Sequence, residues 1–182
     1  MYNDKAANKI TLSIAVLTLN PDECLSDLLQ TYAKLSTEDC ELVIINQSGV
    51  PVSRIAADTD IYTEISPAEK LSAPAARNHA TEISRGDYII FLDDHCNILT
   101  DKTSFHTLLE LLKKKQSDIV LLDKGKIADG KFVSTCPSRK PSKISYIAAT
   151  RFAVEWNTVF KRELFLDHEG FINIGVGTES AA

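Results

Sequence analysis

The sequence predicts an α/β fold built on a doubly wound, mostly parallel sheet, and three observations support this. The segments "TLSIAVLTLN" (residues 11–20) and "CELVIIN" (residues 40–46) are almost wholly apolar, as expected of strands buried on both faces. Apolar residues recur at helical spacing between them, at Leu25, Leu28, Leu29, Tyr32 and Leu35. A strand, a helix and a second strand in this order favour a right-handed crossover between parallel strands. Polar residues follow the predicted strands where they end, which is where such sheets bind ligands.

The first predicted helix has a recognisable start signal. Asn20 is a good N-cap, Pro21 suits the first helical position, and Glu23 lies three residues after the cap. The sequence therefore predicts that this helix begins directly after the first strand.

The rest of the first two thirds of the chain repeats the alternation of strand and helix. A second helix is predicted near Ser72, with Pro74 in its first turn. The other predicted elements are strands at residues 60–66, 87–94 and 118–125 and a helix at residues 103–115.

The last third of the chain has a mixed pattern. Asp129-Gly130 is a hairpin signal. Strands are predicted at residues 144–149 and 152–160, followed by a short helix at residues 161–166. The glycine-containing segment after it is predicted to be a loop.

Composition excludes several classes of protein. The 182 residues are enough for one domain with a sizeable core, and 44% of them are hydrophobic and 25% charged. A formal net charge of -5 disfavours nonspecific nucleic-acid binding, so no nucleic-acid partner is expected. No apolar run has transmembrane length and no signal peptide is recognised. Four widely spaced cysteines indicate reduced thiols, and we expect a cytoplasmic protein.

The predicted strand at residues 87–94 leads into Asp93, Asp94 and His95, which together suggest a metal site. Neighbouring carboxylates repel each other, and a divalent cation commonly offsets that repulsion. The alternative is that the two aspartates only end the strand and cap the next turn. Two further strand ends, residues 18–20 and 46–48, are expected at the same edge of the sheet, which favours a binding site.

Three segments carry a resemblance to a known family. "SIAVLTLN", "ELVIINQSG" and "SAPAARNHATEISRGDYIIFLDDHCNI" resemble family 2 glycosyltransferases, which have the GT-A fold. The order of Ala76-Arg77-Asn78, Gly86-Asp87-Tyr88 and Phe91 to His95 matches the family's pattern before and at its Asp-x-Asp motif. "WNTVFKRELFLDHEGFINIGVGT" resembles the family's acceptor-side segment. The resemblance implies a single Rossmann-like three-layer domain (residues 1–182), with a nucleotide-binding half (11–125) and an acceptor-side part (126–182).

The resemblance also implies roles for individual residues. The donor would be a UDP- or GDP-sugar, the acceptor a carbohydrate or lipid-linked hydroxyl, and the expected outcome inversion in cell-surface polysaccharide or glycolipid synthesis. The implied metal ligands are Asp93, Asp94 and His95, and the implied acceptor-side residues are Glu155 and Trp156. The implied nucleotide-sugar site consists of Thr18, Leu19, Asn20, Asn46, Ser48, Arg77, Asp93 and Asp94.

Two residues depart from the family's pattern inside this site. Asn46 stands where the family commonly has a base-reading Asp, so uridine preference is open. His95 replaces the usual third carboxylate. Imidazole favours Mn²⁺ over Mg²⁺, so we expect either a working site that prefers Mn²⁺ or a degenerate one. Cys96 is interpreted as a buried thiol, because no second cysteine is near it in sequence.

A third departure concerns catalysis. In the family, an acidic pair after the glycine-rich loop supplies the base, whereas here Glu179 is a weak candidate that aligns before that position. The chain is therefore expected to be truncated, and a noncatalytic nucleotide-binding or scaffolding domain is the alternative function. A sugar nucleotidyltransferase is disfavoured, because "LTLNPDEC" lacks the Gly, Arg and Lys of a phosphate loop. The basic segments at 113–115 and 138–143 allow a peripheral membrane association at the inner face, or attraction of an anionic lipid-linked acceptor. The alternatives are a helix end where cations suit the dipole and a solvated loop.

Overall fold

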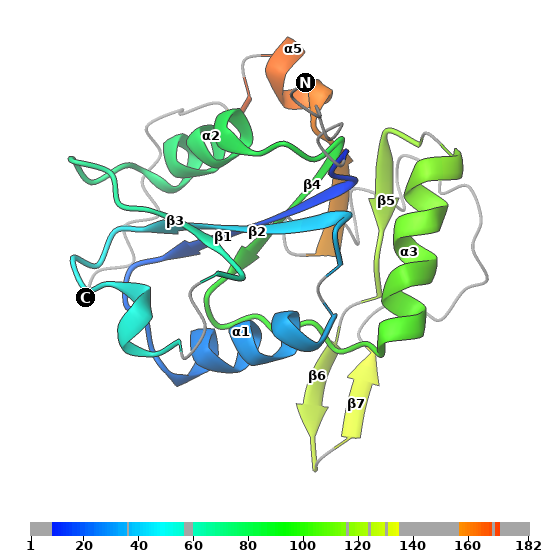
Figure 1. Cartoon of the computed structure of the whole chain (residues 1–182), viewed down its shortest axis with the longest axis horizontal. Coiled ribbons are helices and arrows are strands. Elements are labelled where there is room, and N and C mark those ends of the chain that lie inside the picture. The colour runs from blue at the N-terminus through cyan, green and yellow to red at the C-terminus, as the bar shows by residue number, and fades with distance from the viewer. Residues whose placement is uncertain are drawn as a thin grey trace, which may run out of the picture.

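The computed structural model describes residues 9–35, 37–56, 60–115, 117–123, 125–129, 131–134, 157–168 and 170–171. Its central sheet has six strands in the order β3-β2-β1-β4-β8-β5 (Figure 1). The strands are β1 (Leu12–Thr18), β2 (Cys40–Asn46), β3 (Thr63–Ile65), β4 (Tyr88–Asp93), β5 (Ile119–Leu121) and β8 (Thr158–Lys161). The strands β3, β2, β1 and β4 are parallel, while β8 runs antiparallel to both β4 and β5. The predicted α/β class, with a mostly parallel sheet and a mixed C-terminal part, is confirmed.

Helices cover both faces of this sheet (Figure 1). The helices α1 (Glu23–Leu35) and α3 (Lys102–Lys115) share one hydrophobic cluster with β1, β2 and β4. The helices α2 (Ala73–Ile83) and α5 (Glu163–Asp167) lie on the opposite face. There, Phe91 of β4 contacts Phe165 and Phe171 edge-to-face, at 5.5 and 5.2 Å between ring centroids. The result is a three-layer arrangement whose core lies on both sides of the parallel strands.

The remaining elements are small. A single 3₁₀ turn, η1 (Val52–Arg54), follows β2, and the hairpin of β6 (Gly125–Ala128) and β7 (Lys131–Ser134) projects away from the sheet (Figure 1). Asp129 at its turn has a φ of 51°, the left-handed conformation that the Asp-Gly signal predicted. No helix in the described part of the chain is long and apolar enough to cross a membrane.

The predicted start of α1 is wrong. Asp22, not Asn20, caps the helix, because its side-chain oxygen accepts hydrogen bonds from the N–H groups of Cys24 and Leu25. The backbone N–H of Asn20 instead donates to Thr18 Oγ1 at 3.2 Å, which holds Asn20 at the strand end. Pro21 therefore precedes the cap, and the helix begins two residues later than predicted.

The other predicted elements agree with the structure to different degrees. The helix near Ser72 is confirmed, because Ser72 is its N-cap and accepts from the N–H of Ala75. Of the predicted strand at residues 152–160, residues 158–160 lie in β8, and the helix predicted at 161–166 begins at Glu163, because Lys161 still belongs to the strand. The predicted strand at 144–149 lies outside the described residues. The division at residue 125 stays a prediction.

A polar cluster at the opposite end of the strands joins β1, β2 and β4. Burial raises the pKa of Glu41, but hydrogen bonds from Ser13 Oγ, at 2.6 Å, and from Arg85 outweigh this effect and leave that pKa lowered. Ser13 Oγ accepts in turn from the N–H of Gly86. A Cβ at Gly86 would lie 2.6 Å from the backbone nitrogen of Ser13, so the close approach of the two strands requires glycine there.

We expect Glu41→Gln to destabilise the protein at neutral pH by about 1.5–3 kcal/mol, the usual worth of hydrogen bonds to a charged group. A depressed pKa stabilises the fold above the unfolded value near 4.3 and ceases to do so as pH falls through the folded value. The deficit should therefore shrink below about pH 4. Urea denaturation at several pH values measures it, with the exposed Glu69→Gln as control; equal deficits in both variants would contradict the prediction.

Candidate functional site

The carboxyl ends of β1, β2 and β4 meet at one edge of the sheet. Thr18 is paired with Asn46 across β1 and β2, and Leu17 is paired with Asp93 across β1 and β4. Each strand is held in place by the buried apolar residues that precede its end. The predicted convergence of the three strand ends is therefore present in the structure.

Asp94 is held by the first strand. Its Oδ2 accepts a hydrogen bond of 2.8 Å from Thr18 Oγ1, and Thr18 is fully buried. Its Oδ1 lies 3.6 Å from Nδ1 of His95, whose side chain is 72% exposed. Asp94 thus links the buried hydroxyl of Thr18 to the accessible imidazole of His95.

The side chain of Asp93 faces α2. Arg77 of α2 lies with Nη2 3.6 Å from Asp93 Oδ1, and its guanidinium carbon is 5.8 Å from the ring centre of Phe171. The Arg77 side chain is mostly buried, so a cation is fixed next to the strand end. A fixed guanidinium of this kind suits a phosphate or orients a carboxylate.

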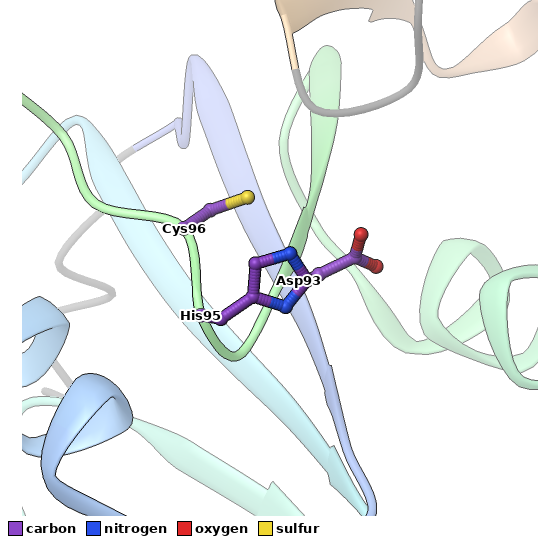
Figure 2. A group of neighbouring side chains, drawn as sticks. All are labelled: Asp93, His95 and Cys96. Atoms are coloured by element: carbon purple, nitrogen blue, oxygen red, sulfur yellow. The ribbon is translucent and has the colours of Figure 1, made fainter. Parts of the chain in front are cut away.

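Asp93, His95 and Cys96 form a group that could hold a metal ion (Figure 2). One ligand atom from each of them lies within 4.8 Å of the other two. An oxygen, an imidazole nitrogen and a sulfur fit a divalent transition metal better than Mg²⁺, which prefers oxygen ligands. Two of the three predicted ligands, Asp93 and His95, belong to this group, while Asp94 contacts Thr18 and His95 beside it.

The structure qualifies the interpretation of Cys96 as a buried thiol. It is half-buried, packs against the apolar cluster on the α1 side, and burial raises its pKa. Its sulfur nevertheless belongs to the same group as the Asp93 carboxylate and the His95 imidazole. The three-residue spacing from Asp93, typical of a tight turn, was the signal in the sequence.

Asn46 is almost fully buried, and its amide is occupied within the protein. Its Nδ2 donates to Glu64 Oε1 at 2.6 Å and to the Val50 carbonyl at 2.7 Å. Its Oδ1 accepts from both the N–H and the hydroxyl of Ser48. Asn46 therefore organises the loop after β2. Sequence reasoning missed Glu64, because the contact joins residues of different strands.

The other predicted site residues are placed as follows. Leu19 is 55% exposed at the end of β1, and Asn20 is exposed next to it. Gln47 accepts a hydrogen bond from the N–H of Leu71, which ties the loop after β2 to the segment before α2. The predicted acceptor-side residues Glu155 and Trp156 and the candidate base Glu179 lie outside the described residues.

A family model supplies the deciding observation. The model described as "Glycosyl transferase family 2" matches residues 13–168, which is most of the chain. The chain belongs to glycosyl transferase family 2. Among curated protein sequences, none matches it.

Solved structures agree with the family at the level of the fold. TarS 1-349 from S. aureus is 17% identical with a TM-score of 0.72 over 89% of this chain and 50% of its own. The same protein in complex with UDP-GlcNAc has a TM-score of 0.63 at 16% identity, over 89% of this chain and 48% of its own. The mannosyltransferase PcManGT from Pyrobaculum calidifontis, in complex with GDP-Man and Mn²⁺, has a TM-score of 0.63 at 17% identity, over 88% and 47%. This family 2 chain thus spans about half the length of the structures it resembles, and shares with them the predicted GT-A fold.

Proposed function

We propose that this family 2 domain binds a nucleotide-sugar at the carboxyl edge of its sheet and transfers the sugar, with inversion, to an acceptor hydroxyl. The observation that carries the proposal is the meeting of Thr18, Asp93 and Asp94 at one edge, beside the fixed cation of Arg77. Carboxylates and a guanidinium at this edge match a metal-bound diphosphate in charge and position. TarS with UDP-GlcNAc and PcManGT with GDP-Man support a UDP- or GDP-sugar donor.

The chain's residues divide the work of binding. Leu19, Asn20, Asn46 and Ser48 form the wall for the nucleoside, with Asn46 shaping the loop from within. Arg77 holds Asp93 and faces the diphosphate, and Asp94 orients His95. Of the three predicted ligands, Asp93 and His95 would hold the metal and Asp94 would support His95, with Mn²⁺ favoured over Mg²⁺ because imidazole is a ligand. The metal would stabilise the departing diphosphate, and a carboxylate base would take the acceptor proton.

Several parts of the proposal concern the whole protein and its location. Glu155 and Trp156 are assigned to the acceptor side, and the acceptor is a carbohydrate or lipid-linked hydroxyl of cell-surface polysaccharide or glycolipid synthesis. A cytoplasmic location at the inner face of the membrane fits such an acceptor, and the basic segments at 113–115 and 138–143 would contact the membrane surface.

A panel of nucleotides tests the proposal. We expect UDP, GDP and their sugars to raise the melting temperature in the presence of Mn²⁺ by several degrees, because a ligand at 100 times its Kd adds about 2.7 kcal/mol. Omitting Mn²⁺ should remove most of the shift, since metal and diphosphate bind together. An unchanged melting temperature with all nucleotides, in any divalent metal, would sink the proposal. Binding without any hydrolysis of the donor would favour a noncatalytic nucleotide-binding domain instead.

A further inference from the structure

We propose that Cys96 is a metal ligand and that the group of Asp93, His95 and Cys96 takes a thiophilic divalent ion of the Zn²⁺ or Co²⁺ class. The inference deepens the proposed function, because the group lies at the edge assigned to the donor's diphosphate. Three observations support it: the closed turn at residues 93–96, the ligand atoms in that turn, and the hydrogen bond from Thr18 to Asp94.

The turn after β4 brings the three side chains together. The carbonyl of Asp93 accepts a hydrogen bond of 2.9 Å from the N–H of Cys96, so residues 93–96 form a closed turn. Closing the turn sets its first and fourth residues opposite each other, with His95 between them (Figure 2). The three ligand atoms come within 4.8 Å of one another for this reason.

The spacing is close to that of a tetrahedral site. Zn–S bonds of about 2.3 Å and Zn–N bonds of about 2.0 Å place tetrahedral ligand atoms roughly 3.3–3.6 Å apart. The ligand atoms, which lie within 4.8 Å of one another, therefore need to approach by at most about 1.5 Å when an ion binds. The His95 side chain is largely exposed, so little packing opposes the small movement that brings it into place. Three protein ligands leave a fourth position open for a phosphate oxygen.

The residues behind the group orient the imidazole. Asp94 Oδ1 lies 3.6 Å from His95 Nδ1, and Thr18 Oγ1 holds the other oxygen of Asp94. If His95 moves slightly toward Asp94, its Nδ1–H donates a hydrogen bond to Asp94 Oδ1. This leaves Nε2 of His95 as the metal-binding nitrogen. Carboxylates commonly support histidine ligands in this way.

The donor set decides which ions bind. Sulfur and imidazole ligands favour Co²⁺ and Zn²⁺ over Mn²⁺, in line with the general order of divalent affinities. All three ions are favoured over Mg²⁺, which prefers oxygen ligands. The thiol proton is released to solvent when the metal–sulfur bond forms. Zn²⁺ or Co²⁺ therefore competes with Mn²⁺ for this turn, and Zn²⁺ leaves fewer open positions for the diphosphate.

Absorption spectroscopy with Co²⁺ detects a metal–sulfur bond directly. The wild-type protein is titrated with Co²⁺ under anaerobic conditions with a reductant that carries no thiol, and the near-ultraviolet absorption is recorded. We expect a thiolate-to-cobalt charge-transfer band that saturates at one Co²⁺ per chain and disappears on addition of Zn²⁺. Cys96→Ser should lose the band and bind Co²⁺ at least about 10-fold more weakly. Cys24→Ser, which alters an exposed cysteine of α1, should keep both.

The exposed residue His95 provides a second variant that is expected to fold. His95→Ala should weaken Co²⁺ binding at least about 10-fold, since one of three ligands is removed. No charge-transfer band in wild type, an equal band in Cys96→Ser, or unchanged affinity in His95→Ala would overturn the proposal. Failure of the proposed function looks different: no nucleotide would shift the melting temperature, while the cobalt band would remain.

Discussion

Replacing Asp93 with Asn is expected to lower the metal-dependent affinity for UDP or GDP by at least about 100-fold, or about 2.7 kcal/mol. Asp93 contacts Arg77 on one side and belongs to the metal-ligand group on the other. An amide is a weaker ligand than a carboxylate and has no charge to pair with the guanidinium. The substitution should therefore weaken the candidate metal site and remove the carboxylate that pairs with Arg77, the residue proposed to face the diphosphate.

Isothermal titration of Asp93→Asn and wild type with UDP and GDP, with and without Mn²⁺, measures this effect. The matched control is Asp101→Asn, an exposed residue that caps α3 by accepting from the N–H of Ser104. Asparagine caps helices as well as aspartate does, so this control should bind nucleotide as wild type does. Equal Mn²⁺ dependence in Asp93→Asn and wild type would show that Asp93 does not serve the metal.

The second large effect is expected from Asn46→Asp, although aspartate is the residue that the family commonly has there. Asn46 Nδ2 lies 2.6 Å from Glu64 Oε1, so the substitution sets two carboxylates against each other in a nearly buried place. We expect a loss of about 2–3 kcal/mol of stability at pH 7, because a buried donor is replaced by a repelling charge. The loop after β2, which Asn46 holds through Ser48 and Val50, should open.

The stability of Asn46→Asp should depend on pH, because protonating one of the two facing carboxylates removes their repulsion. Two carboxylates this close titrate as a pair, and the second ionisation of the pair moves above the usual value near 4.3. A raised folded-state pKa destabilises the variant at high pH and does so less as pH falls toward that pKa. The deficit of Asn46→Asp relative to wild type should therefore be smaller at pH 5 than at pH 7.

Chemical denaturation at these two pH values checks the prediction. Adding Glu64→Gln should restore part of the stability, since its amide can donate to the new aspartate, while the Val50 carbonyl still lacks the donor that Asn46 supplied. Asn97→Asp is the control, because Asn97 is exposed and its oxygen accepts from the N–H of Ile98, as aspartate also would. A pH-independent deficit, or no rescue in the double variant, would mean that Glu64 is not the partner that matters.

Much of the fold could be predicted because its signals are local. The runs that form β1 and β2 are apolar on both faces, and the polar residues that end them meet at one edge of the sheet. Ser72 and the pair Asp129-Gly130 are likewise local signals, and the helix and the turn form where they predict. The start of α1 could not be decided in this way, since Asn20 and Asp22 are both good caps. In the structure, the oxygen of Asp22 accepts from the N–H groups of Cys24 and Leu25, so Asp22 is the cap.

By itself, the sequence determined the buried strands β1, β2 and β4, the family and the group of polar residues at one edge, because hydrophobic period and short motifs depend on neighbours in the chain. Only the tertiary structure decided how those residues are used. It paired Asn46 with Glu64 and Thr18 with Asp94, and set β8 antiparallel between β4 and β5. It also brought the sulfur of Cys96 to Asp93 and His95. Such partnerships depend on the packing of separate strands and on the closure of a turn, and no periodicity in the sequence records them.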